Sequence, residues 1–125
     1  MWLEIGKTVL EIFSKKKQIE LESKERISGV LKQIAHILNE TSFELSQNQY
    51  PHGKCALMES LSISLVKELR TSGTIDEYIL ADLEKMLLES SKLEREFAMR
   101  ENPETIIHLS VTAGKLEAIS LLLNI

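Results

Sequence analysis

The residues of this chain that could do chemistry gather in one short run near its middle, Pro51-His52-Gly53-Lys54-Cys55. A thiol near a helix N-terminus and near basic side chains ionises more readily than a free thiol, so Cys55 is a candidate nucleophile or redox switch. The free backbone N–H groups of the same helix start, together with Lys54, could hold an anion. We call residues 51–55 the candidate turn, and its candidate functional residues are His52, Gly53, Lys54 and Cys55.

The same residues also have a purely structural interpretation, which we favour. Pro51 can start a helix, Gly53 permits close packing, and Cys55 can fill the core as a small apolar residue. A Cys–His nucleophile also needs an orienting Asn, Asp or Glu and an oxyanion hole, and a helical bundle offers no obvious cleft for them. His52 and Cys55 supply too few ligands for structural zinc, which takes about four. We therefore expect a protein that is not an enzyme, with no catalytic residue, no metal site and no cofactor.

The composition limits the class of protein that this chain can be. Its 125 residues are 43% hydrophobic and 27% charged, with only 5 Gly and 2 Pro. A single cysteine excludes an intramolecular disulfide, and so few turn-forming residues disfavour the many hairpins of a β-sandwich or barrel. The net charge is −4, and all of it comes from residues 51–125, which hold eight Lys/Arg against twelve Asp/Glu. Because a nucleic-acid binder usually presents a basic face, we expect no nucleic-acid partner.

Proline and glycine divide the chain into segments with helical periodicity. Residues 22–48 carry apolar side chains on one helical stripe, formed by Ile27, Val30, Leu31, Ile34, Leu38 and Leu45. Tyr50 precedes a proline, is biased out of the helical region and so ends this helix. Pro51 then opens the next helix, and Gly73 ends it. The apolar stripe of that second helix is Met58, Leu61, Leu65 and Leu69.

The second half of the chain predicts two further helices. Thr74 and Glu77 have the spacing of a capping box, which predicts a helix start. The positions that follow have the 4-3-4-3-4 spacing of a bundle seam, namely Ile79, Leu83, Met86, Ser90, Leu93 and Phe97. A last helix starts at Asn102 and Pro103, which supply an N-cap and a proline at the first helical position. Its inner stripe is Ile106, Leu109, Ala113, Leu116 and Leu123.

The N-terminal segment is the candidate interaction helix, with apolar residues Trp2, Ile5, Val9, Ile12 and Phe13. Three alternatives stay open for its apolar side: packing into the bundle, into a dimer mate, or onto anionic lipid with Lys15–Lys17 close by. Glu4 and Glu11 weaken any attraction to anionic lipid, so we favour packing. Residues 1–17 could also form a semi-independent helix.

These segments together predict an all-α protein with one domain over residues 1–125. The expected architecture is an up-and-down bundle of four main helices plus a short N-terminal amphipathic helix. A helix of ~25 residues spans about 38 Å, which is long for a compact domain of this size and suggests an elongated bundle or a dimer that shares helix faces. No apolar run approaches the ~18–20 residues that span a bilayer, and no secretory signal is recognisable, so we expect a cytoplasmic protein.

One stretch of the sequence resembles helical domains in poorly characterised bacterial proteins, many of them cyanobacterial. The residues that carry the resemblance are Arg26-Ile27-x-x-Val30-Leu31-x-x-Ile34-Ala35-x-x-Leu38 and Asn48-x-Tyr50-Pro51-His52-Gly53-Lys54-Cys55-x-Leu57. It implies a bacterial, non-catalytic accessory or interaction module, with His52, Gly53 and Cys55 as family markers. We therefore expect a protein–protein interaction, adaptor or regulatory module that forms a homo-oligomer. The alternative is a peripheral membrane protein that binds through its N-terminal helix and Lys15–Lys17.

Overall fold

The computed structural model describes residues 1–14, 21–73 and 75–123. These described residues are 85% helical and contain no strand, which confirms the all-α prediction. The elements are α1 (Trp2–Ser14), α2 (Leu21–Ser46), α3 (Lys54–Thr71), α4 (Glu77–Ser90), the short 3-10 helix η1 (Leu93–Met99) and α5 (Pro103–Leu123).

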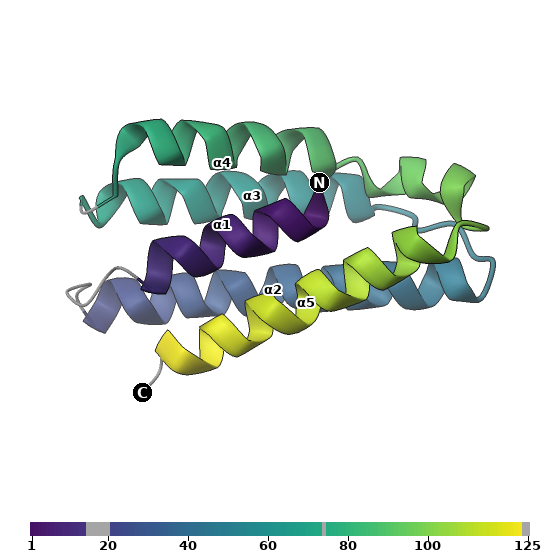
Figure 1. The fold of residues 1–125 in the computed structure, drawn as a ribbon, viewed down its shortest axis with the longest axis horizontal. Helices are drawn as coiled ribbons and strands as arrows, with labels where there is room; N and C mark the ends of the chain where they lie inside the picture. The colour runs from purple at the N-terminus through teal and green to yellow at the C-terminus, as the bar shows by residue number, and fades with distance from the viewer. Residues whose placement is uncertain (15–20, 74, 124–125) are drawn as a thin grey trace.

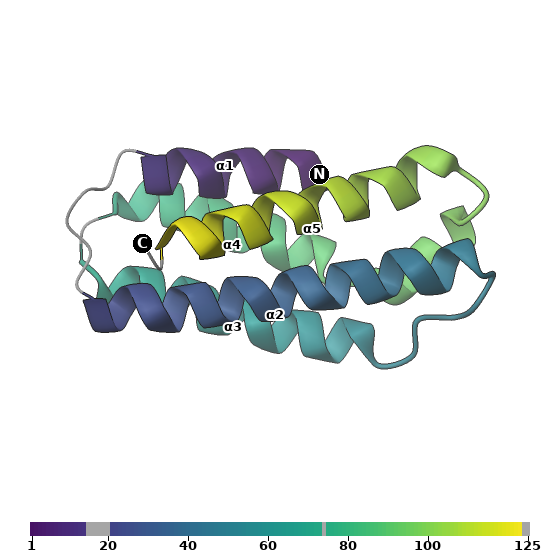
Figure 2. The same ribbon diagram turned by 90° about the horizontal axis from the view of Figure 1, so that it is seen from below.

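The five α-helices close into a ring (Figures 1 and 2). In the order α1, α5, α2, α3, α4, each helix packs against the next, and α4 returns to contact α1. Their inward stripes meet in a single hydrophobic core. The largest side chains that are fully buried there are Ile5, Ile27, Leu31, Ile34, Leu38, Met58, Leu65, Leu69, Leu80, Leu83, Leu87 and Leu93. The N-terminal helix α1 is therefore one of the helices that enclose the core of this bundle.

Helix α2 contacts α5 along most of its length, and buried hydroxyl groups fix the pairing near both ends. Ser28 donates from Oγ to the backbone oxygen of Ser120 at 2.9 Å. Ser42 donates in the same way to the oxygen of Ile106 at 3.2 Å. Because low residue numbers on one helix meet high numbers on the other, α2 and α5 run antiparallel. These bonds fix the position of α5 along the bundle.

The helix ends next to the candidate turn differ from the prediction. Helix α2 ends at Ser46 rather than at Tyr50, because Asn48 adopts a left-handed conformation with φ 58°. The N–H of Asn48 then donates to Leu45 O at 3.1 Å, and that of Gln49 to Glu44 O at 2.8 Å. This pattern caps a helix C-terminus, and asparagine tolerates the backbone that it requires. Tyr50 follows outside the helix.

The start of α4 and its seam also differ from the prediction. Asp76 caps α4 and accepts the N–H of Tyr78 at 2.9 Å, so the helix begins at Glu77, while Thr74 lies outside the described residues. The inward stripe consequently includes Leu80, whereas Ile79 is 41% exposed. The helix stops at Ser90, and the last two predicted seam positions lie in η1. Just beyond this end, the hydroxyl of Ser91 donates to a carbonyl of the last turn, Leu88 O, which competes with continued helix.

Other helix ends were predicted correctly. Gly73 follows α3 with φ +69° and donates its N–H to Arg70 O at 3.1 Å. Asn102 caps α5 by accepting the N–H of Glu104 at 3.0 Å, and Pro103 is the first helical residue. The glycine after α3 and the asparagine cap before α5 both act through hydrogen bonds to residues two or three positions away, so the local sequence predicts them.

Candidate functional site

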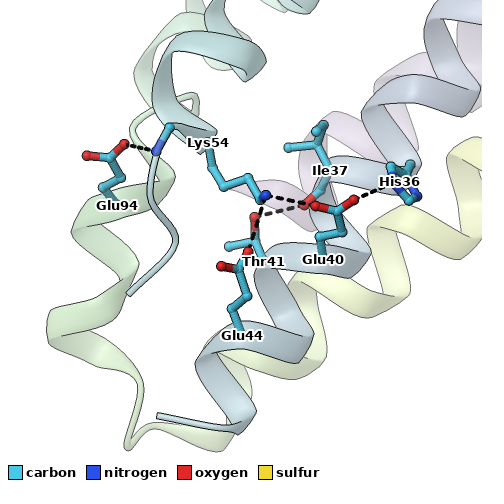
Figure 3. A network of polar contacts seen from close by, with 8 residues as sticks. His36, Ile37, Glu40, Thr41, Glu44, Lys54 and Glu94 are labelled. Atoms are coloured by element: carbon cyan, nitrogen blue, oxygen red, sulfur yellow. Dashed lines mark hydrogen bonds and ion pairs between the residues drawn. The ribbon is translucent and has the colours of Figure 1, made fainter. Parts of the chain in front are cut away.

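The candidate turn lies at the end of the bundle where α2, α3 and η1 meet (Figures 1 and 3). Pro51 is buried and does not open α3, which begins at Lys54. The N–H of His52 donates to Tyr50 O at 2.9 Å, and that of Lys54 to Pro51 O at 3.3 Å, so the chain makes a tight turn before the helix. Gly53 occupies the left-handed region with φ +76°, which explains a glycine at this position.

The ammonium group of Lys54 is enclosed by two carboxylates of α2. Its Nζ lies 2.8 Å from Glu40 Oε2 and 3.3 Å from Glu44 Oε1, and the side chain is only 12% exposed (Figure 3). The hydrogen bond to Glu40 raises the pKa of Lys54 above its usual range, against the lowering effect of burial. The same bond lowers the pKa of Glu40, whose other carboxylate oxygen pairs with His36 Nε2. Lys54 therefore links α3 to α2, and the predicted anion site loses its cation.

The start of α3 is already occupied by a carboxylate of the protein itself. Glu94 of η1 accepts the backbone N–H of Gly53 at 2.9 Å with Oε1 (Figure 3). Its Oε2 accepts the hydroxyl of Tyr50 at 3.0 Å, and this bond raises the pKa of Tyr50. A negative charge at a helix N-terminus is favourable, so Glu94 fills the role expected for an external anion. The sequence contains no local signal for this contact, because Glu94 is 41 residues from Gly53.

Aromatic contacts complete the attachment of η1 to the chain between α2 and α3. The ring of Tyr50 lies edge-on to His52, with centroids 4.6 Å apart, and to Phe97, at 5.4 Å. Arg100 stacks on Phe97 at 4.0 Å and donates a hydrogen bond from Nε to Asn48 Oδ1. Edge-on ring pairs and guanidinium–ring contacts each add modest stabilisation to the area they bury. The candidate turn is thus held by structural contacts on two sides.

Cys55 is half-buried, whereas we expected it in the core. It lines a surface pocket of about 310 Å³ together with Tyr50, Lys92, Glu94 and Arg95. Glu94 already accepts two hydrogen bonds, so it is engaged and is not placed as a free base for the thiol. Among the described residues, no group of three or more His, Cys, Asp or Glu could hold a metal ion.

The candidate interaction helix turns its apolar side into the bundle. Trp2, Ile5, Val9 and Ile12 are at most 6% exposed, and Phe13 is half-buried. Of the three alternatives for this helix, the structure shows the first, in which α1 packs into its own bundle against α4 and α5. Lys15–Lys17 lie outside the described residues.

The outer side of α5 is the apolar surface that the sequence prediction missed. Ile107, Val111, Leu121 and Leu122 are 54%, 40%, 54% and 64% exposed. Figure 2 shows α5 running between α1 and α2, with this side uncovered by any other described helix. We call it the outer face of α5, and its exposed residues are Ile107, Ser110, Val111, Gly114, Ala118, Leu121 and Leu122.

Both sides of α5 are apolar, which raises its hydropathy. Its mean hydropathy reaches 1.5 over 18 residues, so by length and composition it could cross a membrane, against our expectation that no segment approaches this limit. A core helix passes the same test, and one such helix is weak evidence for a membrane span. Its second apolar stripe is the signal in the sequence that could have revealed the outer face.

No family model, curated protein or solved structure matches this chain. The resemblance of the Pro-His-Gly-Lys-Cys segment to bacterial helical domains therefore stays a prediction.

Replacing Gly53 with Ala is expected to lower the free energy of unfolding by about 1–2 kcal/mol, because an L-residue is strained at φ +76°. A Cβ at this position would meet no atom within 4 Å, so the effect is conformational. Gly29 in α2 also has open space around it and serves as the matched control. Gly29→Ala should raise stability by about 0.5–1 kcal/mol in urea unfolding. Equal effects of both substitutions would contradict this account.

Proposed function

We propose that this chain is a non-catalytic, cytoplasmic interaction module that acts by binding protein and that self-associates. The observation that carries the proposal is the outer face of α5. Four large apolar side chains are exposed along this one helix, while the opposite side of the same helix packs in the core. Contiguous exposed apolar surface on a soluble domain is typical of an interaction site.

The contacts of the candidate turn support a role other than catalysis. Lys54 is paired with carboxylates of α2, and Glu94 accepts the N–H of Gly53. An active site needs groups that are free to act on a substrate, and these groups stabilise the fold instead. A structural role for the turn agrees with a protein that acts through its surface.

Peripheral membrane binding through α1 has less support. The apolar side chains that would enter the lipid, such as Trp2 and Ile5, are buried against α4 and α5. Binding to lipid through them would require α1 to leave the bundle and expose the core. The core contacts of α1 therefore favour the interaction module.

The substitution Ile107→Glu tests the proposal. We expect the wild-type protein to sediment as an oligomer at micromolar concentration. In the variant, the dissociation constant of the oligomer should rise by about tenfold or more, because the substitution places a charge in an apolar interface. Ile63→Glu in α3 is the matched control, because Ile63 is 51% exposed and lies on another face. Sedimentation velocity over a dilution series provides the measurement.

Two results would count against the proposal. A wild-type protein that stays monomeric at all concentrations would remove self-association. Flotation with anionic vesicles that Trp2→Glu abolishes, and Ile107→Glu does not, would instead establish the membrane alternative through α1.

A further inference from the structure

We infer that the outer face of α5 binds the same face of a second copy of this chain, with the two α5 helices parallel and in register about a two-fold axis. The inference rests on the proposed self-association and adds the surface and the geometry of pairing. It is carried by the residue spacing, the flanking charges and the residue sizes on this face.

The exposed residues have the spacing of a coiled-coil seam. Ile107, Val111, Gly114, Ala118 and Leu121 follow one another at intervals of 4-3-4-3, and all are exposed. A stripe with this period stays on one side of a helix and packs against an equivalent stripe of a partner helix. The inward stripe of α5 is already used against α1 and α2. The helix therefore carries a second seam, directed away from its own bundle.

The charges beside this seam select the partner and its direction. Lys115 and Glu117 are exposed and lie about 80° to either side of the seam, by the helical angle of about 100° per residue. In a parallel two-fold pair, the Lys115 edge of one copy faces the Glu117 edge of the other. In an antiparallel pair, each edge would face its own equivalent, with like charges together. A second copy placed parallel is thus complementary in charge, and like-charge contacts are avoided.

Small residues in the middle of the seam permit close contact. Gly114 and Ala118 are neighbours along the seam, one helical turn apart, and a Cβ built on Gly114 would meet nothing within 4 Å. Two helix backbones can approach closely over such residues. Ile107 and Leu121 lie at the two ends of this small-residue region, where each would pack against its own equivalent in the partner.

Disulfide cross-linking of full-length protein separates the possible arrangements. Cys55→Ser provides a background without thiols, and Ile107→Cys or Leu121→Cys is then added singly. A parallel pair brings each new cysteine near its own equivalent, within the ~4.4–6.8 Å between Cα atoms that a disulfide needs. We expect each single variant to form covalent dimers under mild oxidation, at least about fivefold more than the control Ile63→Cys in the same background.

The outcomes distinguish this inference from the proposed function. Cross-links that form only when Ile107→Cys is mixed with Leu121→Cys would mean antiparallel pairing and would overturn the inference. An oligomer in sedimentation without any cross-link through α5 would overturn it too, while self-association would stand. A protein that is monomeric in sedimentation and forms no cross-link would overturn both. Circular dichroism of each variant confirms that the bundle has folded.

Discussion

Replacing Ile5 with Ala is expected to lower the free energy of unfolding by about 2–4 kcal/mol. Ile5 is fully buried, and α1 packs against both α4 and α5, so the lost methyl groups leave a cavity inside the closed ring. A cost of this size arises only where surrounding side chains cannot collapse into the space. Urea unfolding of the full chain, followed by circular dichroism, measures it.

Leu10→Ala is the matched control on the same helix. Leu10 is 46% exposed, so its truncation should change stability by no more than about 0.5 kcal/mol. If Ile5→Ala were as mild as Leu10→Ala, α1 would be a semi-independent helix and would not close the ring.

Replacing Lys54 with Met is expected to lower the free energy of unfolding by about 1–2 kcal/mol at neutral pH. The substitution keeps an unbranched apolar stem of four atoms but removes the ammonium group between Glu40 and Glu44. Two carboxylates of neighbouring helical turns are then left without their shared cation and repel each other. Partial exposure of Glu40, at 40%, limits the loss through solvent screening.

The effect of Lys54→Met should depend on pH in a defined way. The pKa of Glu40 is lowered by Lys54, so this part of the stabilisation is present above the ordinary value of 4.5 and disappears as pH falls through the lower folded-state pKa. The pKa of Lys54 is raised, so the stabilisation that Lys54 contributes is present below its ordinary value of 10.5. This stabilisation disappears as pH rises through the higher folded-state pKa. The difference between wild type and variant should therefore be largest between these limits and shrink beyond both.

Lys67→Met is the control for this series. Lys67 lies on the same helix and is exposed, so its replacement should change stability by no more than about 0.5 kcal/mol at any pH. A pH-independent loss in Lys54→Met would contradict the ion pairs and indicate a change in packing alone.

The sequence was informative wherever a few neighbouring residues decide the structure. Asn102 and Pro103 start α5, and Gly73 ends α3, because a cap or a left-handed glycine acts through bonds within one turn of a helix. The sequence also predicts which side of α2 is buried, because this helix carries its apolar stripe on a single face. The end of this helix was misplaced, because Asn48 can also adopt an ordinary conformation and the sequence does not select between the two.

By itself, the sequence determined that the chain is helical, where several helices begin and end, and which side of α2 is buried. Only the tertiary structure decided that α1 closes a ring, that Glu94 occupies the start of α3, and which apolar side of α5 stays outside. The physical reason is the separation along the chain between the residues that interact. Caps and helical periodicity involve bonds between near neighbours, whereas these features join segments tens of residues apart. For α5, with apolar residues on both sides, burial depends on which neighbouring helices cover it.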